Sequence, residues 1–202
     1  MDLCRERRLD PLALLDAYLR GGASLIQLRD KTSPGGARLD LASTMVRVAH
    51  GAGARIVVND RADVARLAGA DGVHVGQDDL SVEEVRAIVG SGAVVGVSTH
   101  DERQLEQALR TSASYIAVGP IYGTSSKDTG YSARGLELVQ RAARTGRPIV
   151  AIGGITLERA PHVIAAGAAS VAVISDLLVG DPEARTRAFV RALEGDGDSE
   201  TG

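Results

Sequence analysis

Residues 72–90, GVHVGQDDLSVEEVRAIVG, contain one complete strand–loop–helix unit. The run Gly72–Val75 is short, apolar and β-branched, as is typical of a buried strand. Ser81 with Glu84 three residues later forms a capping box, which marks the start of a helix, and Gly90 is placed to end it. A buried strand that leads through a polar loop into a capped helix is the repeating unit of a parallel sheet covered by helices.

The same unit recurs along the whole chain. We predict strands at Leu25–Leu28, Ile56–Val58, Gly72–Val75, Val94–Val97, Tyr115–Val118, Ile149–Ile152 and Ser170–Val173. We predict helices at Pro11–Arg20, Gly36–Ala52, Ala62–Ala68, Ser81–Val89, Glu102–Arg110, Leu136–Thr145, Leu157–Ala165 and Pro182–Leu193. Strict alternation of strand and helix predicts an α/β fold, a (β/α)8 TIM barrel. We expect one domain over residues 1–194 and, because residues 195–202 carry no apolar side chain, a disordered C-terminal tail.

The predicted strands number one fewer than the helices, so the first strand of the barrel is truncated or missing at the N-terminus. Either residues Met1–Cys4 supply a remnant of that strand, or the true start of the chain lies upstream. We expect the second arrangement. Mass spectrometry of the native protein that finds Met1 as its terminus would exclude it.

Composition excludes several classes of protein. The chain has 202 residues, 44% of them hydrophobic, and a formal net charge of -3, with no run of lysine or arginine that could bind a nucleic acid. No apolar stretch approaches the roughly 20 residues that cross a bilayer, so we expect a cytoplasmic protein without membrane partners. The single cysteine, Cys4, excludes an intrachain disulfide and a cysteine metal cluster. A homo-oligomer is compatible with this sequence.

Polar residues concentrate at the C-terminal ends of the predicted strands, where barrels of this type carry their active sites. In Gln27-Leu28-Arg29-Asp30-Lys31, the alternation of a strand points Gln27 and Arg29 into the barrel mouth, and Lys31 extends beyond them. Charged groups that face inward need a partner or a ligand. We favour a ligand; a structural salt bridge to Asp60 or Asp79 is the alternative.

Two carboxylates, Asp60 and Asp79, follow neighbouring predicted strands. Mg²⁺ binds one or two carboxylates together with substrate phosphate and water, so this pair is a candidate magnesium site. Asp79 could instead cap the following helix. His74 lies inside a strand and is interpreted as a satisfied core histidine, and His100 is given little weight as a catalyst.

The loops after the last two predicted strands form a candidate phosphate site. Gly153-Gly154 follows one strand and Ile174-Ser175 precedes a short turn after the next; glycine admits close approach of backbone N–H groups to phosphate. The segment from Gly119 to Lys127 carries Thr124, Ser126 and Lys127, and we expect it to close as a lid over phosphate oxygens. A solvated linker is the alternative interpretation.

Six segments at these strand ends resemble thiamine-phosphate synthases, in the same order and over nearly the whole chain. They are Gln27-Leu28-Arg29-Asp30-Lys31, Asn59-Asp60-Arg61, Gly72-Val73-His74-Val75-Gly76-Gln77-Asp78-Asp79, Gly119-Pro120-Ile121-Tyr122, Gly153-Gly154-Ile155 and Ile174-Ser175. The chain differs from the family pattern at Gly123, where proline is usual, and at Ser126, where threonine is usual.

The resemblance implies an enzyme that transfers the hydroxymethylpyrimidine group from its diphosphate to the nitrogen of a thiazole phosphate, releasing pyrophosphate with help from Mg²⁺. It implies that the reaction depends on Arg29, Lys31, Ser98 and Lys127. Substrate contacts are expected from Gln27, Leu28, Arg29, Asp30, Lys31, Asn59, Ser98, Thr124, Ser125, Ser126, Lys127, Gly154, Ile174 and Ser175, and Mg²⁺ ligands from Asp60 and Asp79.

Two other functions compete with this interpretation. A thiazole tautomerase-like paralogue would use a histidine on the loop where this chain has Pro120. A non-catalytic barrel that binds phosphate ligands would not need Lys31, Asn59 and Lys127. Asp60 and Asp79 together favour the metal-assisted transfer.

Overall fold

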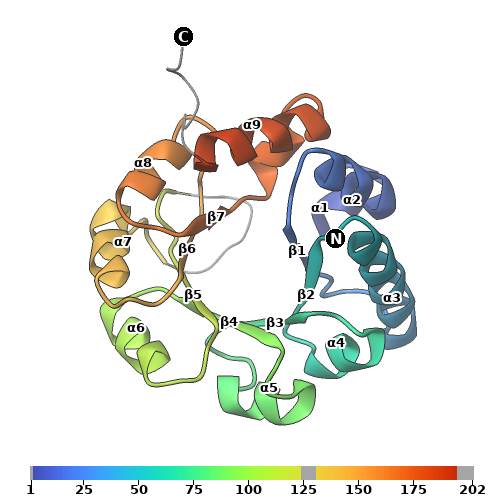
Figure 1. Cartoon of the computed structure of the whole chain (residues 1–202), viewed down its shortest axis with the longest axis horizontal. Coiled ribbons are helices and arrows are strands. Elements are labelled where there is room, and N and C mark those ends of the chain that lie inside the picture. Colours follow the sequence, from blue (N-terminus) through green and yellow to red (C-terminus); the bar gives the residue numbers. More distant parts are fainter. Residues whose placement is uncertain (1, 124–130, 195–202) are drawn as a thin grey trace.

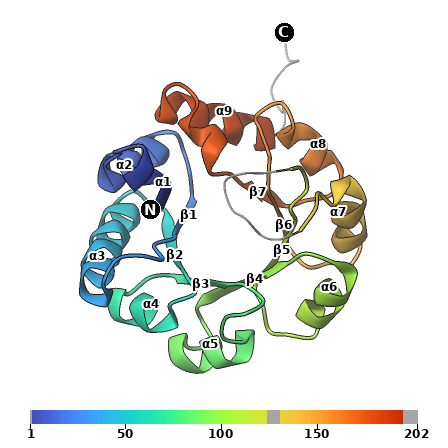
Figure 2. The ribbon, with the colours of Figure 1, turned by 180° about the vertical axis from the view of Figure 1, so that it is seen from behind.

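The computed structural model describes residues 2–123 and 131–194. Its centre is a sheet of seven parallel strands in which each strand pairs with the next one along the chain. The strands are β1 (Leu25–Leu28), β2 (Arg55–Asn59), β3 (Gly72–Val75), β4 (Val94–Thr99), β5 (Tyr115–Val118), β6 (Ile149–Ile152) and β7 (Ser170–Ala172). Figure 1 shows the sheet curved around a central axis with the helices outside it, and Figure 2 shows the same arrangement from behind.

The helices are α1 (Asp2–Glu6), α2 (Pro11–Arg20), α3 (Gly35–Gly51), α4 (Ala62–Ala68), α5 (Val82–Val89), α6 (Glu102–Leu109), α7 (Gly135–Ala143), α8 (Ala160–Ala165) and α9 (Pro182–Glu194), with a 3₁₀ turn, η1 (Ser175–Leu178). Local sequence explains several of their ends. Ser81 and Glu84 form the expected capping box of α5, and Asp101 accepts the hydrogen bond of Gln104 N at the start of α6. The starts of α5 and α6 are therefore explained by local sequence.

The two faces of the sheet carry different side chains. Val73 and Val75 of β3 belong to the apolar core shared with the helices, and Val95 and Val97 of β4 do the same. The residues between them point to the inner face, because side chains alternate along a strand. The inner face therefore holds His74 and its neighbours, and the larger apolar core lies between the sheet and the ring of helices.

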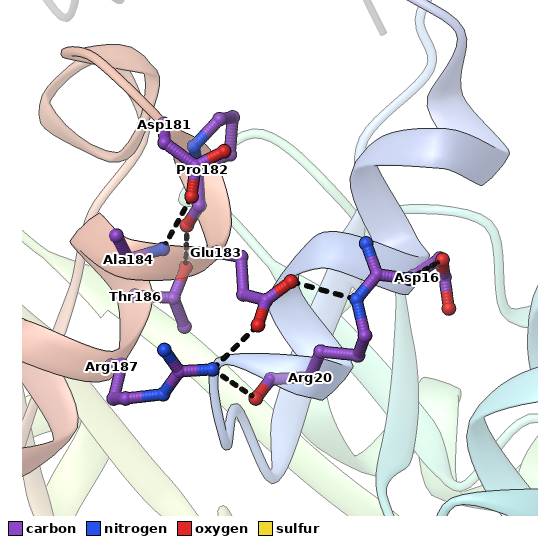
Figure 3. Close-up of polar contacts among 8 residues, drawn as sticks. All are labelled: Asp16, Arg20, Asp181, Pro182, Glu183, Ala184, Thr186 and Arg187. Carbon is purple, nitrogen blue, oxygen red and sulfur yellow. Dashed lines mark hydrogen bonds and ion pairs between the residues drawn. The ribbon is translucent and has the colours of Figure 1, made fainter.

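The first and last long helices pack against each other and so complete the ring of helices. Figure 3 shows the polar part of this contact: Glu183 of α9 accepts a 2.7 Å hydrogen bond from Arg20 Nε of α2, and Arg187 donates to the backbone oxygen of Arg20 at 3.3 Å. Arg20 also pairs with Asp16 one turn earlier. A Cβ atom on Gly21 would lie 2.5 Å from Thr186 Cβ, so glycine permits this close approach of α2 to α9.

The predicted α/β fold with parallel strands is confirmed, and all seven predicted strands are present with small changes at their ends. The suggested strand remnant at Met1–Cys4 is wrong, because residues Asp2–Glu6 form a helix. Short-range bonds such as Leu9 N to Cys4 O hold that segment in a helical turn rather than beside a strand. The predicted tail, residues 195–202, lies outside the described residues. Over the part of the chain that is described, no helix is long and apolar enough to span a membrane.

Candidate functional site

The loops that leave β1, β2 and β3 bring together a lysine and two carboxylates. Lys31 Nζ lies 3.1 Å from Asp60 Oδ2, and Asp60 has a left-handed backbone conformation with φ of 62°. A hydrogen bond from Asp60 N to His74 O, at 2.8 Å, holds it there. Non-glycine residues rarely adopt such a conformation, and aspartate is one of the residue types that adopt it more readily. The backbone thus turns the Asp60 carboxylate toward Lys31.

Burial raises the pKa of the Asp60 carboxyl, and the neighbouring Asp79 raises it further, while Lys31 acts in the opposite direction. Two carboxylates held together disfavour the state in which both are ionised, and a cation between them removes that cost. Asp79 Oδ2 accepts a 2.8 Å hydrogen bond from Gly76 N. Since Ser81 caps α5, Asp79 does not serve as the helix cap that we considered as its alternative role.

Asp60 and Asp79 fit a magnesium ion whose remaining coordination positions are filled by substrate and water. Asp60 and Asp79 both line a pocket whose other walls include Arg61, Asp63 and Leu80. Within the described residues there is no group of three His, Cys, Asp or Glu side chains that could hold a metal without further ligands. Mg²⁺ commonly takes one or two carboxylates and fills its octahedron with phosphate oxygens and water. The donor set therefore suits an ion that binds together with a phosphorylated ligand.

The segment from Gln27 to Lys31, which ends β1 and begins the following loop, has both exposed and buried positions. Gln27 and Lys31 are exposed and Arg29 is partly exposed at the carboxyl end of β1. Leu28 is 3% exposed and packs in the apolar core, so its side chain is turned away from the mouth. The Asp30 side chain has no exposed surface and accepts hydrogen bonds from Thr32 N and Ser33 N, which makes it a support for its own loop. For Leu28 and Asp30, only backbone atoms remain available to a ligand.

The loops after β6 and β7 form a second polar site, which we call the glycine-pair site (Gly153, Gly154, Ile174 and Ser175). Both glycines have positive φ, and a Cβ atom on Gly154 would lie 2.5 Å from Gly123 O. Arg159 Nη1 donates to Gly154 O at 2.7 Å. Ile174 precedes the 3₁₀ turn that begins at Ser175. Backbone N–H groups at such a turn suit a phosphate group.

Side chains that local patterns did not single out support this second site. Asp176 Oδ2 accepts hydrogen bonds from Leu157 N and from Arg185, which lies in α9. The Arg159 guanidinium lies 4.4 Å from the centre of the Tyr122 ring. The Asp176–Arg185 and Arg159–Tyr122 contacts join segments that are separate in the sequence, so a short motif does not indicate them.

The remaining candidates lie deeper or outside the described residues. Ser98, on β4, is 3% exposed, and its hydroxyl contacts His74 Nε2 at 2.8 Å. Asn59 ends β2 beside His74 in the sheet register. His100 is buried, and its Nδ1 is hydrogen-bonded to Gly119 O. Thr124, Ser125, Ser126 and Lys127 fall outside the part of the chain that the structure describes.

Comparison with known proteins identifies close relatives. Residues 3–177 match the model of a family described as thiamine monophosphate synthase. A thiamine-phosphate synthase of Roseiflexus castenholzii is 45% identical over 186 residues, which cover 91% of this chain and 81% of that protein. One from Chlorobium luteolum is 43% identical over 185 residues, covering 91% and 87%. The solved structure of thiamine phosphate pyrophosphorylase from Pyrococcus furiosus superimposes with a TM-score of 0.86 at 29% identity, over 93% of this chain and 92% of that one.

Proposed function

The chain belongs to the thiamine monophosphate synthase family, and on this premise we propose that it condenses hydroxymethylpyrimidine diphosphate with a thiazole phosphate. The products are thiamine phosphate and pyrophosphate. The observation that carries this proposal is the convergence of Lys31 with the Asp60 and Asp79 carboxylates at one end of the sheet. A diphosphate leaving group requires cations and a metal-binding carboxylate pair, and the arrangement supplies both.

We assign the two substrates to the two polar sites. The pyrimidine diphosphate binds at Gln27, Arg29, Lys31, Asn59 and Ser98, next to Asp60 and Asp79. The thiazole phosphate binds at the glycine-pair site, where backbone N–H groups replace its hydration shell. Thr124, Ser125 and Ser126 belong to the thiazole phosphate site in this proposal, and Lys127 to the diphosphate. Fixing both substrates converts a bimolecular reaction into an oriented one.

The chemistry follows from charge. When the carbon–oxygen bond to diphosphate breaks, positive charge develops on the pyrimidine methylene and negative charge on the leaving oxygen. Mg²⁺ held by Asp60 and Asp79 would supply charge neutralisation to the diphosphate. Lys31 and Arg29 stabilise the same negative charge from the side of β1, while the glycine-pair site holds the thiazole nitrogen near the reacting carbon. The nitrogen attacks with its own lone pair, so the step needs no general base.

We also propose the remaining features of the fold, the location, the partners and the cofactor. We propose one domain over residues 1–194 of the (β/α)8 barrel type; the eighth strand of such a barrel would lie between β7 and β1 and is not among the described elements. We also propose a cytoplasmic location, small-molecule substrates without nucleic-acid or membrane partners, and Mg²⁺ as the cofactor.

The test is formation of thiamine phosphate by purified protein from both substrates, with and without Mg²⁺, for the wild type and Asp60→Ala. We expect metal-dependent product and a loss of about 100-fold or more in Asp60→Ala. Asp63→Ala is the matched control, because Asp63 lines the same pocket but is exposed and pairs with Arg61. Product without metal, or full activity in a folded Asp60→Ala variant, would contradict the metal site; no product from folded wild type would contradict the function.

A further inference from the structure

A histidine on the inner face of the sheet has both ring nitrogens engaged. His74 is 8% exposed, its Nδ1 lies 2.8 Å from the hydroxyl of Tyr115, and its Nε2 lies 2.8 Å from the Ser98 hydroxyl. The His74 and Tyr115 rings are stacked with centroids 5.6 Å apart. Tyr115, His74 and Ser98 thus form a continuous hydrogen-bonded chain that ends at a residue of the proposed pyrimidine diphosphate site.

A glycine in the strand between them lets His74 and Tyr115 reach each other. His74 on β3 pairs with Gly96 on β4, which in turn pairs with Tyr115 on β5. A Cβ atom on Gly96 would overlap the Tyr115 ring at Cζ. The missing side chain lets the Tyr115 ring cross β4 and reach a histidine two strands away. Because glycine weakens a strand interior, its use here indicates that the crossing serves a purpose.

One arrangement of protons along Tyr115, His74 and Ser98 leaves the Ser98 hydroxyl free to donate. Burial raises the pKa of the Tyr115 phenol above its ordinary value of 10.0, so the hydroxyl keeps its proton. A phenol that donates to Nδ1 fixes the neutral imidazole with its proton on Nε2. In that tautomer Nε2–H donates to the Ser98 oxygen, which leaves the Ser98 proton for a further acceptor. Gln77 Nε2 donates to the Ser98 backbone oxygen at 2.6 Å and holds the same residue from the loop side.

We propose that Tyr115 and His74 are positioning residues that hold the Ser98 hydroxyl as a hydrogen-bond donor to the pyrimidine diphosphate substrate. This inference rests on the proposed function, which places Ser98 in that substrate's site. Neither His74 nor Tyr115 needs to touch the substrate, since each acts through Ser98. The arrangement explains why a polar chain is maintained in the interior, where each unmatched polar group would cost free energy.

A double-mutant cycle tests the coupling. Ser98→Ala and His74→Leu should each lower kcat/KM for the pyrimidine diphosphate by about 10- to 100-fold, the usual effect of losing a hydrogen bond to a charged group. In the Ser98→Ala background, His74→Leu should lower kcat/KM by less than about 3-fold, because the Ser98 hydroxyl through which His74 acts is already absent. His74→Gln, whose amide N–H can stand near the position of Nε2–H, should recover most of the activity. Independent, multiplicative effects of the two substitutions would overturn the proposal.

A second measurement does not depend on turnover. In ¹⁵N spectra of histidine-labelled protein, the wild-type His74 ring should be neutral with its proton on Nε2, and Tyr115→Phe, which only removes the hydroxyl, should change that tautomer distribution. A proton on Nδ1 in the wild type would overturn the proposed arrangement of protons. If wild-type protein forms no thiamine phosphate, the proposed function fails, while these spectra still decide whether the hydrogen-bonded chain exists.

Discussion

Asp176 and Arg185 are joined by two hydrogen bonds to a single carboxylate oxygen: Oδ2 of Asp176 accepts from Arg185 Nη2 at 2.6 Å and from Nε at 3.1 Å. The same oxygen accepts from Leu157 N at 3.0 Å. One atom of η1 is therefore tied to α9 and to the loop that follows β6. Both side chains are mostly buried, with 13% of Asp176 and 19% of Arg185 exposed. This pair fixes the two loops of the glycine-pair site relative to each other.

Replacement of Arg185 by methionine should weaken thiazole phosphate binding more than it affects the pyrimidine diphosphate. The variant removes both Arg185 hydrogen bonds from the mostly buried Asp176 carboxylate, and we expect a loss of about 2 to 3 kcal/mol in unfolding free energy. The KM for thiazole phosphate should rise by roughly 10-fold, since the loops lose their alignment. Denaturant melts and steady-state kinetics check both expectations. Arg191→Met, at an exposed position of the same helix, is the control, and equal effects of the two variants would contradict this role of Arg185.

Gly154→Ala should damage the glycine-pair site through backbone strain and a direct clash. Gly154 has φ of 63°, and a Cβ atom would lie 2.5 Å from Gly123 O and 2.8 Å from Tyr122 Cβ. Gly146→Ala is a matched control, because Gly146 has φ of 74° but has no atom near its Cβ position. We expect both variants to lose about 1 kcal/mol from strain. Only Gly154→Ala should also lose thiazole phosphate affinity, measured by calorimetric titration; unchanged affinity in that variant would remove Gly154 from the site.

Much of the fold could be predicted because its signals are local. The strand at Gly72–Val75 and the helix that ends at Val89 are marked by apolar runs, a capping box and a terminal glycine, all within about 20 residues. The segment Asp2–Glu6 carried no comparable signal, and its helical turn is supported by contacts such as that of Arg5 with Ser33. The strand remnant suggested at Met1–Cys4 was wrong because no local signal in that segment distinguished a strand from a helix.

The candidate site could be predicted only in part. Lys31, Asp60 and Asp79 could be predicted to lie close together because each follows a strand and all parallel strands end at the same edge, and the structure places them together. Asp30 lies in the same loop, yet its side chain is buried against its own backbone, a distinction that residue type alone does not make. The contact of Tyr115 with His74 could not be predicted, because His74 lies on β3 and the glycine that makes room for the Tyr115 ring, Gly96, lies on β4. Pairing across the sheet determines such contacts, and it is visible only in three dimensions.

Gly21→Ala should destabilise the whole protein by separating α2 from α9. The added methyl group would lie 2.5 Å from Thr186 Cβ and 2.8 Å from Glu183 O, inside the contact that completes the ring of helices. Overpacking of this kind costs about 1 to 3 kcal/mol, which for a protein of this size corresponds to a fall in Tm of several degrees. Gly51→Ala is the control, because that position in α3 has open space around it and should be neutral or slightly stabilising. A Gly21→Ala variant as stable as the wild type would mean that the helix contact contributes little.

Asp30 gives the loop after β1 a stability that depends on pH. Burial alone would raise the pKa of its carboxyl, but hydrogen bonds from the Ser33 side chain and from the Ser33 and Thr32 backbone, together with Arg5, outweigh burial and lower the pKa below 3.8. A group whose folded-state pKa is depressed stabilises the fold above its unfolded pKa, and this contribution is lost as the pH falls through the folded-state value. The charge of Asp30 therefore contributes fully at neutral pH and progressively less below about pH 4.

Asp30→Asn should accordingly lower the unfolding free energy by about 1 to 2 kcal/mol at pH 7, because an amide replaces the charged acceptor and brings two N–H donors into a site with no exposed surface. The difference from wild type should stay constant down to about pH 5 and shrink below about pH 4, where the wild-type carboxyl of the unfolded chain takes up its proton. Urea melts across this range measure the difference directly. Asp40→Asn, at an exposed position of α3, should show almost no effect at any pH. A difference for Asp30→Asn that persists unchanged to pH 3 would show that packing, and not the ionised carboxylate, is what the loop requires.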